Sequence, residues 1–169
     1  MVSGTSFADA LGIVPVAAQA GSPILLNDVD SLNLQTRNAL KDWGIRDITI
    51  VGGESVISQD VMIELINLGY RVDRVSGLTR YHTNISIAER YFEQPTAFVG
   101  ASGEDFPDAL VSAVYAAIHH QPIVLLHPEQ LSTTTINYIQ SQDFEEGLLM
   151  GGPLAISPEV EETIRLLIQ

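Results

Sequence analysis

The chain has 169 residues, a mass of 18.3 kDa and a formal net charge of −13, with 8 basic against 21 acidic side chains. An apolar fraction of 46% is enough to bury a core, which argues against intrinsic disorder. The acidic balance argues against a nucleic-acid partner, and no apolar run approaches the ~20 residues that membrane insertion needs. The absence of cysteine excludes disulfides, thiol catalysis and thiolate metal sites.

Helices and strands are predicted to alternate along the first part of the chain. Apolar runs and capping residues predict, in order, a helix near Ser6–Gln19, a strand at Pro23–Asn27, a helix at Ser31–Trp43, a strand at Asp47–Val51 and a helix at Ser58–Leu68. The only counterpart of a preceding strand is Val2 with Ser3.

The second part of the chain continues the alternation. The predicted elements are a strand at Arg71–Ser76, a helix from Thr79 or Thr83 to Phe92, a strand at Thr96–Ala101, a helix at Phe106–His119, a strand at Pro122–Leu126, a helix at Ser132–Gln140, a strand at Gly147–Met150 and a helix at Ser157–Ile168. Continuously apolar strands between helices indicate parallel sheets covered on both faces. The predicted fold class is therefore α/β, as tandem small doubly wound parallel-sheet modules.

The sequence repeats at an offset of 99 residues. Residues 3–70 align with residues 102–169 without a gap, with 20 identities in 68 pairs. A unit of this length suits a small domain better than a solenoid repeat of 20–45 residues. We therefore predict two units, residues 1–76, incomplete at its start, and residues 77–169.

Two repeated loops are candidate ligand sites. Ser3-Gly4 with Asp9 recurs as Ser102-Gly103 with Asp108, each between a strand end and a helix start. Doubly wound folds bind ligands at such positions, and backbone N–H groups there can hold an anion. The simpler interpretation, which we favour, is that both aspartates match the dipoles of their own helices.

The Gly-Gly pairs and one arginine cluster are further candidates. Gly52-Gly53 and Gly151-Gly152 let a backbone approach phosphate closely, but a tight turn with positive φ explains them more simply. Arg74 and Arg80, next to Tyr81, have the chemistry to read a carboxylate or phosphate. The alternative is that these arginines pair with the chain's own carboxylates. The four histidines lack the spacing of a metal site.

These motifs, in this order, resemble the cell wall binding repeat type 2 family. The pattern comprises Arg74-Val-Ser-Gly77-x-x-Arg80-Tyr81-x-Thr83, the Ser102–Leu110 loop, Pro122–Leu126 and Gly151-Gly152 with Ile156-Ser157. The resemblance implies Toprim-like or flavodoxin-like modules, usually three, that anchor surface-layer proteins, wall hydrolases and adhesins of Gram-positive bacteria at the cell surface. It implies an anionic secondary wall polymer or peptidoglycan as the ligand.

The family's Ile-Leu-Leu anchoring element corresponds to Ile24, Leu25 and Leu26, with Ile123, Val124 and Leu125 at the aligned positions. The resemblance predicts a noncatalytic, extracellular wall-anchoring module without a cofactor or metal, which self-associates or works beside further repeats. Two alternatives remain open. One is a structural assembly module of a surface layer, and the other is an enzyme or small-ligand binder that uses the Ser-Gly and Gly-Gly loops.

Overall fold

The computed structural model describes residues 1–104 and 106–168; Asp105, within the second Ser-Gly loop, and Gln169, at the end of the second predicted unit, lie outside the described residues. Helices and short strands alternate along these ranges, so the predicted α/β class is confirmed. The strands are β1 Val2–Ser3, β2 Leu26–Asn27, β3 Asp47–Val51, β4 Arg71–Val75, β5 Ala97–Ser102, β6 Ile123–Leu126 and β7 Glu146–Met150. The helices are α1 Phe7–Gln19, α2 Leu34–Asp42, α3 Gln59–Asn67, α4 Arg80–Tyr91, α5 Phe106–His119, α6 Thr133–Ser141 and α7 Pro158–Leu167.

The strand pairs are all parallel. In the first unit β1 pairs with β2 and β3 pairs with β4, while the second unit has the order β6-β5-β7. Met1 joins the two pairs of the first unit. Its carbonyl accepts from the Val51 N–H at 3.0 Å, and its ammonium donates to the Thr49 carbonyl at 2.6 Å. The first unit therefore arranges its strands as β2-β1-β3-β4.

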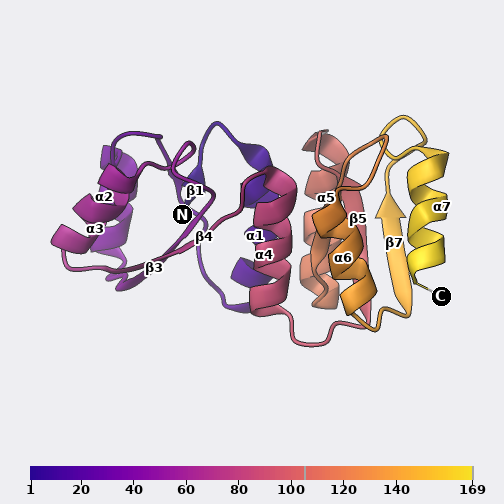
Figure 1. The fold of residues 1–169 in the computed structure, drawn as a ribbon. Helices are drawn as coiled ribbons and strands as arrows, with labels where there is room; N and C mark the ends of the chain where they lie inside the picture. The colour runs from indigo at the N-terminus through magenta and orange to yellow at the C-terminus, as the bar shows by residue number, and fades with distance from the viewer. Residues whose placement is uncertain (105, 169) are drawn as a thin grey trace.

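Helices α1 and α4 lie between the two groups of strands and pack against both (Figure 1). On the first unit's side, Ile13 of α1 and Ile87 of α4 share one buried cluster with Val2, β3 and β4. On the second unit's side, Leu11 of α1 packs with β5 and β6, and Ala88 of α4 packs on the opposite face of the same strands. The two units thus share a helical layer.

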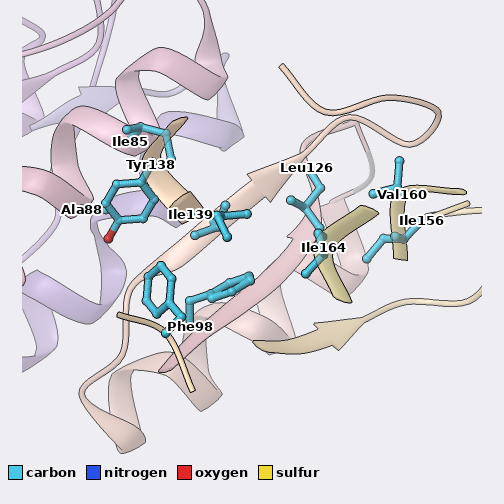
Figure 2. Close-up of a cluster of buried hydrophobic side chains, with 11 residues drawn as sticks. Ile85, Ala88, Phe98, Leu126, Tyr138, Ile139, Ile156, Val160 and Ile164 are labelled. Atoms are coloured by element: carbon cyan, nitrogen blue, oxygen red, sulfur yellow. The ribbon is translucent and has the colours of Figure 1, made fainter. Parts of the chain in front are cut away.

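The largest buried cluster fills the face of the second sheet that carries α4, α6 and α7. Figure 2 shows Phe98 of β5 facing Tyr138 and Ile139 of α6. The Phe98 and Phe144 rings lie 4.8 Å apart between centroids at 60°, a tilted geometry that aromatic pairs favour. This cluster fixes α6 and α7 over β5 and so sets where the loops at the strand ends lie.

Side-chain caps start most helices where the sequence predicts. Ser132 and Ser157 accept hydrogen bonds from the third residue beyond them, Thr135 and Val160, as expected. Thr79, not Thr83, is the N-cap of α4. Thr83 is buried instead, and its hydroxyl accepts the Gly77 N–H at 3.0 Å.

Two predicted boundaries are corrected. The helix expected from Ser31 begins at Leu34, because the Asn33 side chain caps it by accepting the Thr36 N–H. The strand expected at Pro23–Asn27 is reduced to β2, Leu26–Asn27. Its partner β1 offers only two ladder positions, and proline has no N–H with which to extend the ladder.

None of the helices in the described ranges combines the length and the apolarity needed to cross a membrane.

A buried asparagine links α4 to the edge of the second sheet. Asn84 is 2% exposed; its amide donates to the Ile123 carbonyl at 3.0 Å, and its oxygen accepts the Leu125 N–H at 2.7 Å. The side chain therefore satisfies two backbone groups of β6 as a neighbouring strand would.

We expect Asn84→Ala to lower the free energy of unfolding by about 2–4 kcal/mol, because it leaves two buried backbone groups without partners. Urea denaturation measures the change. Asn38→Ala, the same change on the exposed face of α2, serves as the control and should be within about 0.5 kcal/mol of the parent chain. Equal losses in both variants would contradict this role for Asn84.

Candidate functional site

The Ser-Gly loops lie at the carboxyl ends of β1 and β5, and their serines are buried. Thr5 donates its N–H to the Ser3 hydroxyl at 3.2 Å, and Glu104 does the same to the Ser102 hydroxyl at 3.2 Å. Each hydroxyl thus closes a short turn within its own loop. Both units therefore repeat this serine contact.

The glycines of these loops extend the parallel ladders by one step. The Gly4 N–H donates to the Asn27 carbonyl at 3.0 Å, and the Gly103 N–H donates to the Leu126 carbonyl at 2.8 Å. They differ in their surroundings. A Cβ on Gly103 would lie 2.7 Å from the Tyr81 ring, whereas one on Gly4 would meet nothing closer than 3.8 Å.

Each predicted aspartate lies against the Gly-Gly turn of its own unit. Gly52 has φ +106° and Gly151 has φ +132°, so the expected positive φ belongs to the first glycine of each pair. A Cβ on Gly52 would lie 2.8 Å from an Asp9 oxygen, and one on Gly151 would lie 2.9 Å from an Asp108 oxygen. The second glycines, Gly53 and Gly152, have open space around the Cβ position.

Asp9 is an acid held in an unusually buried place. It is 6% exposed, and its Oδ1 has no hydrogen-bond partner. Burial raises the pKa of Asp9 above 3.8, and the nearby Arg80 charge partly opposes that rise. This oxygen can accept a hydrogen bond, but it is closed off from solvent.

Arg74 contacts backbone carbonyls. Its guanidinium donates to the Gly52 carbonyl at 2.8 Å and to the Ser58 carbonyl at 3.4 Å, which ties β4 to the first Gly-Gly turn. Burial lowers the pKa of Arg74. Arg71 does pair with a carboxylate, donating to Asp47 at 2.7 Å.

Arg80 and Tyr81 bring the start of α4 to the second Ser-Gly loop. Arg80 donates to the Gly103 carbonyl at 2.6 Å, and the Tyr81 hydroxyl donates to Glu104 at 2.7 Å. Burial and this carboxylate raise the pKa of Tyr81. The Arg80 side chain remains 40% exposed, so part of its guanidinium faces solvent. Because Arg80 also acts electrostatically on Asp9, this cluster spans both units.

The two copies of the predicted anchoring element differ in burial. Ile123, Val124 and Leu125 are at most 2% exposed in β6, under α1 and α4. Ile24 and Leu25 are half-buried and Leu26 is 57% exposed. The difference arises because α1 covers β6, while no helix in the described ranges covers Leu26 in the same way.

Sequence reasoning missed two residues of this region. Glu104 receives the Tyr81 hydroxyl and lies 3.9 Å from Arg80. Asn84 holds α4 in place behind them. An asparagine between apolar residues of a helical face could have been predicted from the sequence to be buried. The partner of Glu104 could not, because it depends on how the two units pack.

Within residues 1–104 and 106–168, no three histidine or acidic side chains gather as a metal site would require. The chemistry available in this region is hydrogen bonding by Arg80 and Tyr81, with the buried Asp9 carboxylate within electrostatic range of the arginine.

Comparisons with known proteins match most of the chain. The model of the family described as cell wall binding domain 2 (CWB2) matches residues 1–62 and 74–161. The N-acetylmuramoyl-L-alanine amidase LytC of Bacillus subtilis is 30% identical over 165 residues, which are 98% of this chain and 32% of the amidase. The amidase enhancer of the same species is 31% identical over 98% of this chain and 22% of its own length.

A solved structure shares the fold. Cwp6 from Clostridium difficile superposes with a TM-score of 0.88 at 27% identity, over 98% of this chain and 27% of that one. The chain therefore spans about a third or less of the length of each of these proteins.

We expect Asp9→Asn to stabilise the protein at pH 7. Because the folded-state pKa of Asp9 is raised above 3.8, the folded state loses stability as pH rises through 3.8 and the raised value. An amide does not titrate, so the advantage of the variant should grow from pH 4 to neutral pH. Thermal unfolding at several pH values measures it. Asp108→Asn, at the half-buried aligned position, is the control. If Asp9→Asn changes the stability by the same amount at pH 4 and at neutral pH, the argument is wrong.

Proposed function

Since the chain belongs to the cell wall binding domain 2 family, we propose that it is a noncatalytic module that anchors its protein to the bacterial cell wall from outside the cell. Its ligand is a secondary wall polymer or peptidoglycan. The observation that carries the proposal is the family match across both units, together with the likeness to Cwp6. The amidase similarity supports the same role, because a wall hydrolase also needs to be held at its substrate.

The proposed contact region is the cluster where the two units meet. Arg80 and Tyr81 supply hydrogen-bonding groups, and the buried Asp9 carboxylate interacts electrostatically with Arg80. Arg74 with its Gly52 turn and the aligned Asp108–Gly151 turn form related sites at the other strand ends. Sugar hydroxyls both donate and accept, so this mixture suits a glycan better than a bare anion.

The net charge of −13 restricts how such a ligand binds. An anionic polymer is repelled at long range, but salt screens exposed charges beyond about 8–10 Å. Binding then depends on short contacts to a few arginines. Each contact is weak, and repeated sites along one polymer gain strength through effective concentration.

We further propose that the units divide between Ser76 and Gly77. β4 pairs with β3 of the first sheet, whereas α4 packs on β6 and α6 of the second. The covalent chain therefore passes from one unit to the other at this point.

An exposed apolar face on α5 favours a second candidate function, assembly with another copy or a further repeat. Leu110, Val111, Val114 and Ile118 are 44%, 63%, 53% and 68% exposed. The aligned positions of α1 include Leu11, which is 3% exposed because it packs with α5, β5 and β6. A surface of this kind is a typical protein contact.

We expect the protein to sediment with isolated Gram-positive walls, and to lose that binding when the walls are first acid-extracted to remove secondary polymers. Binding that survives extraction would point to peptidoglycan, and a chelator control tests for metal bridging. No binding to either wall preparation would contradict the anchoring role.

A matched pair of variants sharpens this test. Gly103→Ala places a methyl group 2.7 Å from the Tyr81 ring and should weaken wall binding about tenfold, which corresponds to ~1.4 kcal/mol. Gly4→Ala, at the aligned position where the new Cβ meets nothing closer than 3.8 Å, should bind as the parent does. Thermal unfolding of both variants checks that each is folded.

We expect sedimentation equilibrium to show concentration-dependent self-association. Val114→Asp should raise the dissociation constant at least tenfold, because it puts a charge in the centre of the apolar face of α5. Leu34→Asp, on α2 at 64% exposure, is the control. An oligomer that forms without any wall affinity would favour assembly as the sole function, and a strictly monomeric chain would exclude self-association through α5.

A further inference from the structure

Strand β4 is an edge strand of the first sheet. It pairs with β3 on one side, and no other strand in the described ranges pairs with its other side. The Arg71 N–H donates to the Arg46 carbonyl at 2.8 Å, toward β3. Because alternate residues of a strand direct their backbone groups to opposite sides, Val72 and Arg74 direct theirs to the open edge. An edge of this kind is a template for pairing with another chain.

The Asp73 side chain occupies one of these edge groups. Its Oδ1 accepts the Arg74 N–H at 2.8 Å, and its Oδ2 accepts a hydrogen bond from the guanidinium of Arg90 on α4. The bond from Arg90, with a smaller effect from the Arg74 N–H, lowers the pKa of Asp73 below 3.8. The carboxylate is therefore charged at neutral pH and holds the amide that an added strand would need.

Ser86 of α4 closes the edge one step further along the chain. Its hydroxyl donates to the Ser76 carbonyl at 3.4 Å, just beyond the end of β4. Ser86 and Arg90 are four residues apart, so they lie on the same face of the helix. On the open side of β4 itself, these contacts leave the backbone groups of Val72 and the carbonyl of Arg74.

The other charged side chains of β4 turn toward β3 and away from the open edge. Arg71 donates to the Asp47 carboxylate at 2.7 Å. Arg74 donates to the Gly52 carbonyl, directly after β3, at 2.8 Å. Closure of the edge within β4 therefore depends on Asp73.

Helix α4 contacts a strand edge of the second sheet as well. Asn84 bonds two backbone groups of β6, at 3.0 and 2.7 Å. Two positions along a helix correspond to about 200° of rotation, so Asn84 and Ser86 point to opposite sides of α4. One helix thus supplies side chains to strand edges of both sheets.

We propose that Asp73, held in place by Arg90, is a guard that prevents the β4 edges of two copies of the chain from pairing. Without it, the backbone groups of Val72 in one copy can bond those of Arg74 in the other, antiparallel about a twofold axis. The guard limits self-association to other surfaces, such as the apolar face of α5. The inference goes beyond the proposed function, because it involves no wall ligand.

The test replaces Asp73 by alanine in a chain that also carries Val114→Asp, so that association through α5 does not contribute. We expect Asp73→Ala to lower the dissociation constant for self-association at least tenfold relative to Val114→Asp alone, measured by sedimentation equilibrium. Hydrogen exchange at the Val72 and Arg74 amides should slow as the concentration of this variant rises, because both amides enter the new strand pair.

Asp47→Ala in the same background is the matched control. Asp47 is also paired with an arginine across β3 and β4, and its side chain is 68% exposed against 53% for Asp73. This control should associate no more strongly than Val114→Asp alone. Equal association of the two alanine variants, or an Asp73→Ala variant that stays as dissociated as its parent, would overturn the proposal. Association that leaves both edge amides unprotected would do the same.

A measurement on the unaltered chain tests the guard without any substitution. At low protein concentration the Arg74 amide should exchange at least tenfold more slowly than the Val72 amide, after correction for the intrinsic rates of the two sequences, because only Arg74 donates to Asp73. Equal corrected rates at the two amides would show that Asp73 does not hold the edge.

Discussion

The contact between Asn84 and the edge of β6 is the interaction on which the arrangement of the two units depends. A strand edge presents backbone groups that need partners, and here a helix side chain supplies them in a fully buried position. Because Asn84 lies on α4, it fixes that helix against the second sheet, while Ile87 of α4 packs on the first. The shared helical layer then needs no flexible linker between the units.

The position of the cluster around Arg80 and Tyr81 follows from this layer. α4 starts beside the second Ser-Gly loop, so Arg80 and Tyr81 meet Gly103 and Glu104 instead of open solvent. α1 starts beside the first Gly-Gly turn, so Asp9 lies against Gly52. Residues distant in sequence thus gather where the two helices begin, and the cluster exists only when both units are folded together.

Sequence alone predicted the alternation of elements, because apolar runs and caps such as Ser132 and Ser157 are local signals. It also identified Asp9, Asp108 and the two Gly-Gly turns as candidate site residues, because they recur at the offset of 99 residues. It was wrong about the length of β2, which the two-residue β1 limits. It could not predict the partners of Arg74 or the exposure of Leu26, because both depend on what neighbouring units cover.

One difference between the two units lies at a glycine of α1. A Cβ on Gly12 of α1 would lie 3.0 Å from the Asn84 amide and 3.3 Å from Ile87, so α1 and α4 approach closely only where that residue has no side chain. The aligned residue in α5 is Val111. The units are therefore not interchangeable parts: a chain with their order reversed would place a valine where the asparagine needs room. The order of the two units in the chain is therefore fixed by this contact between α1 and α4.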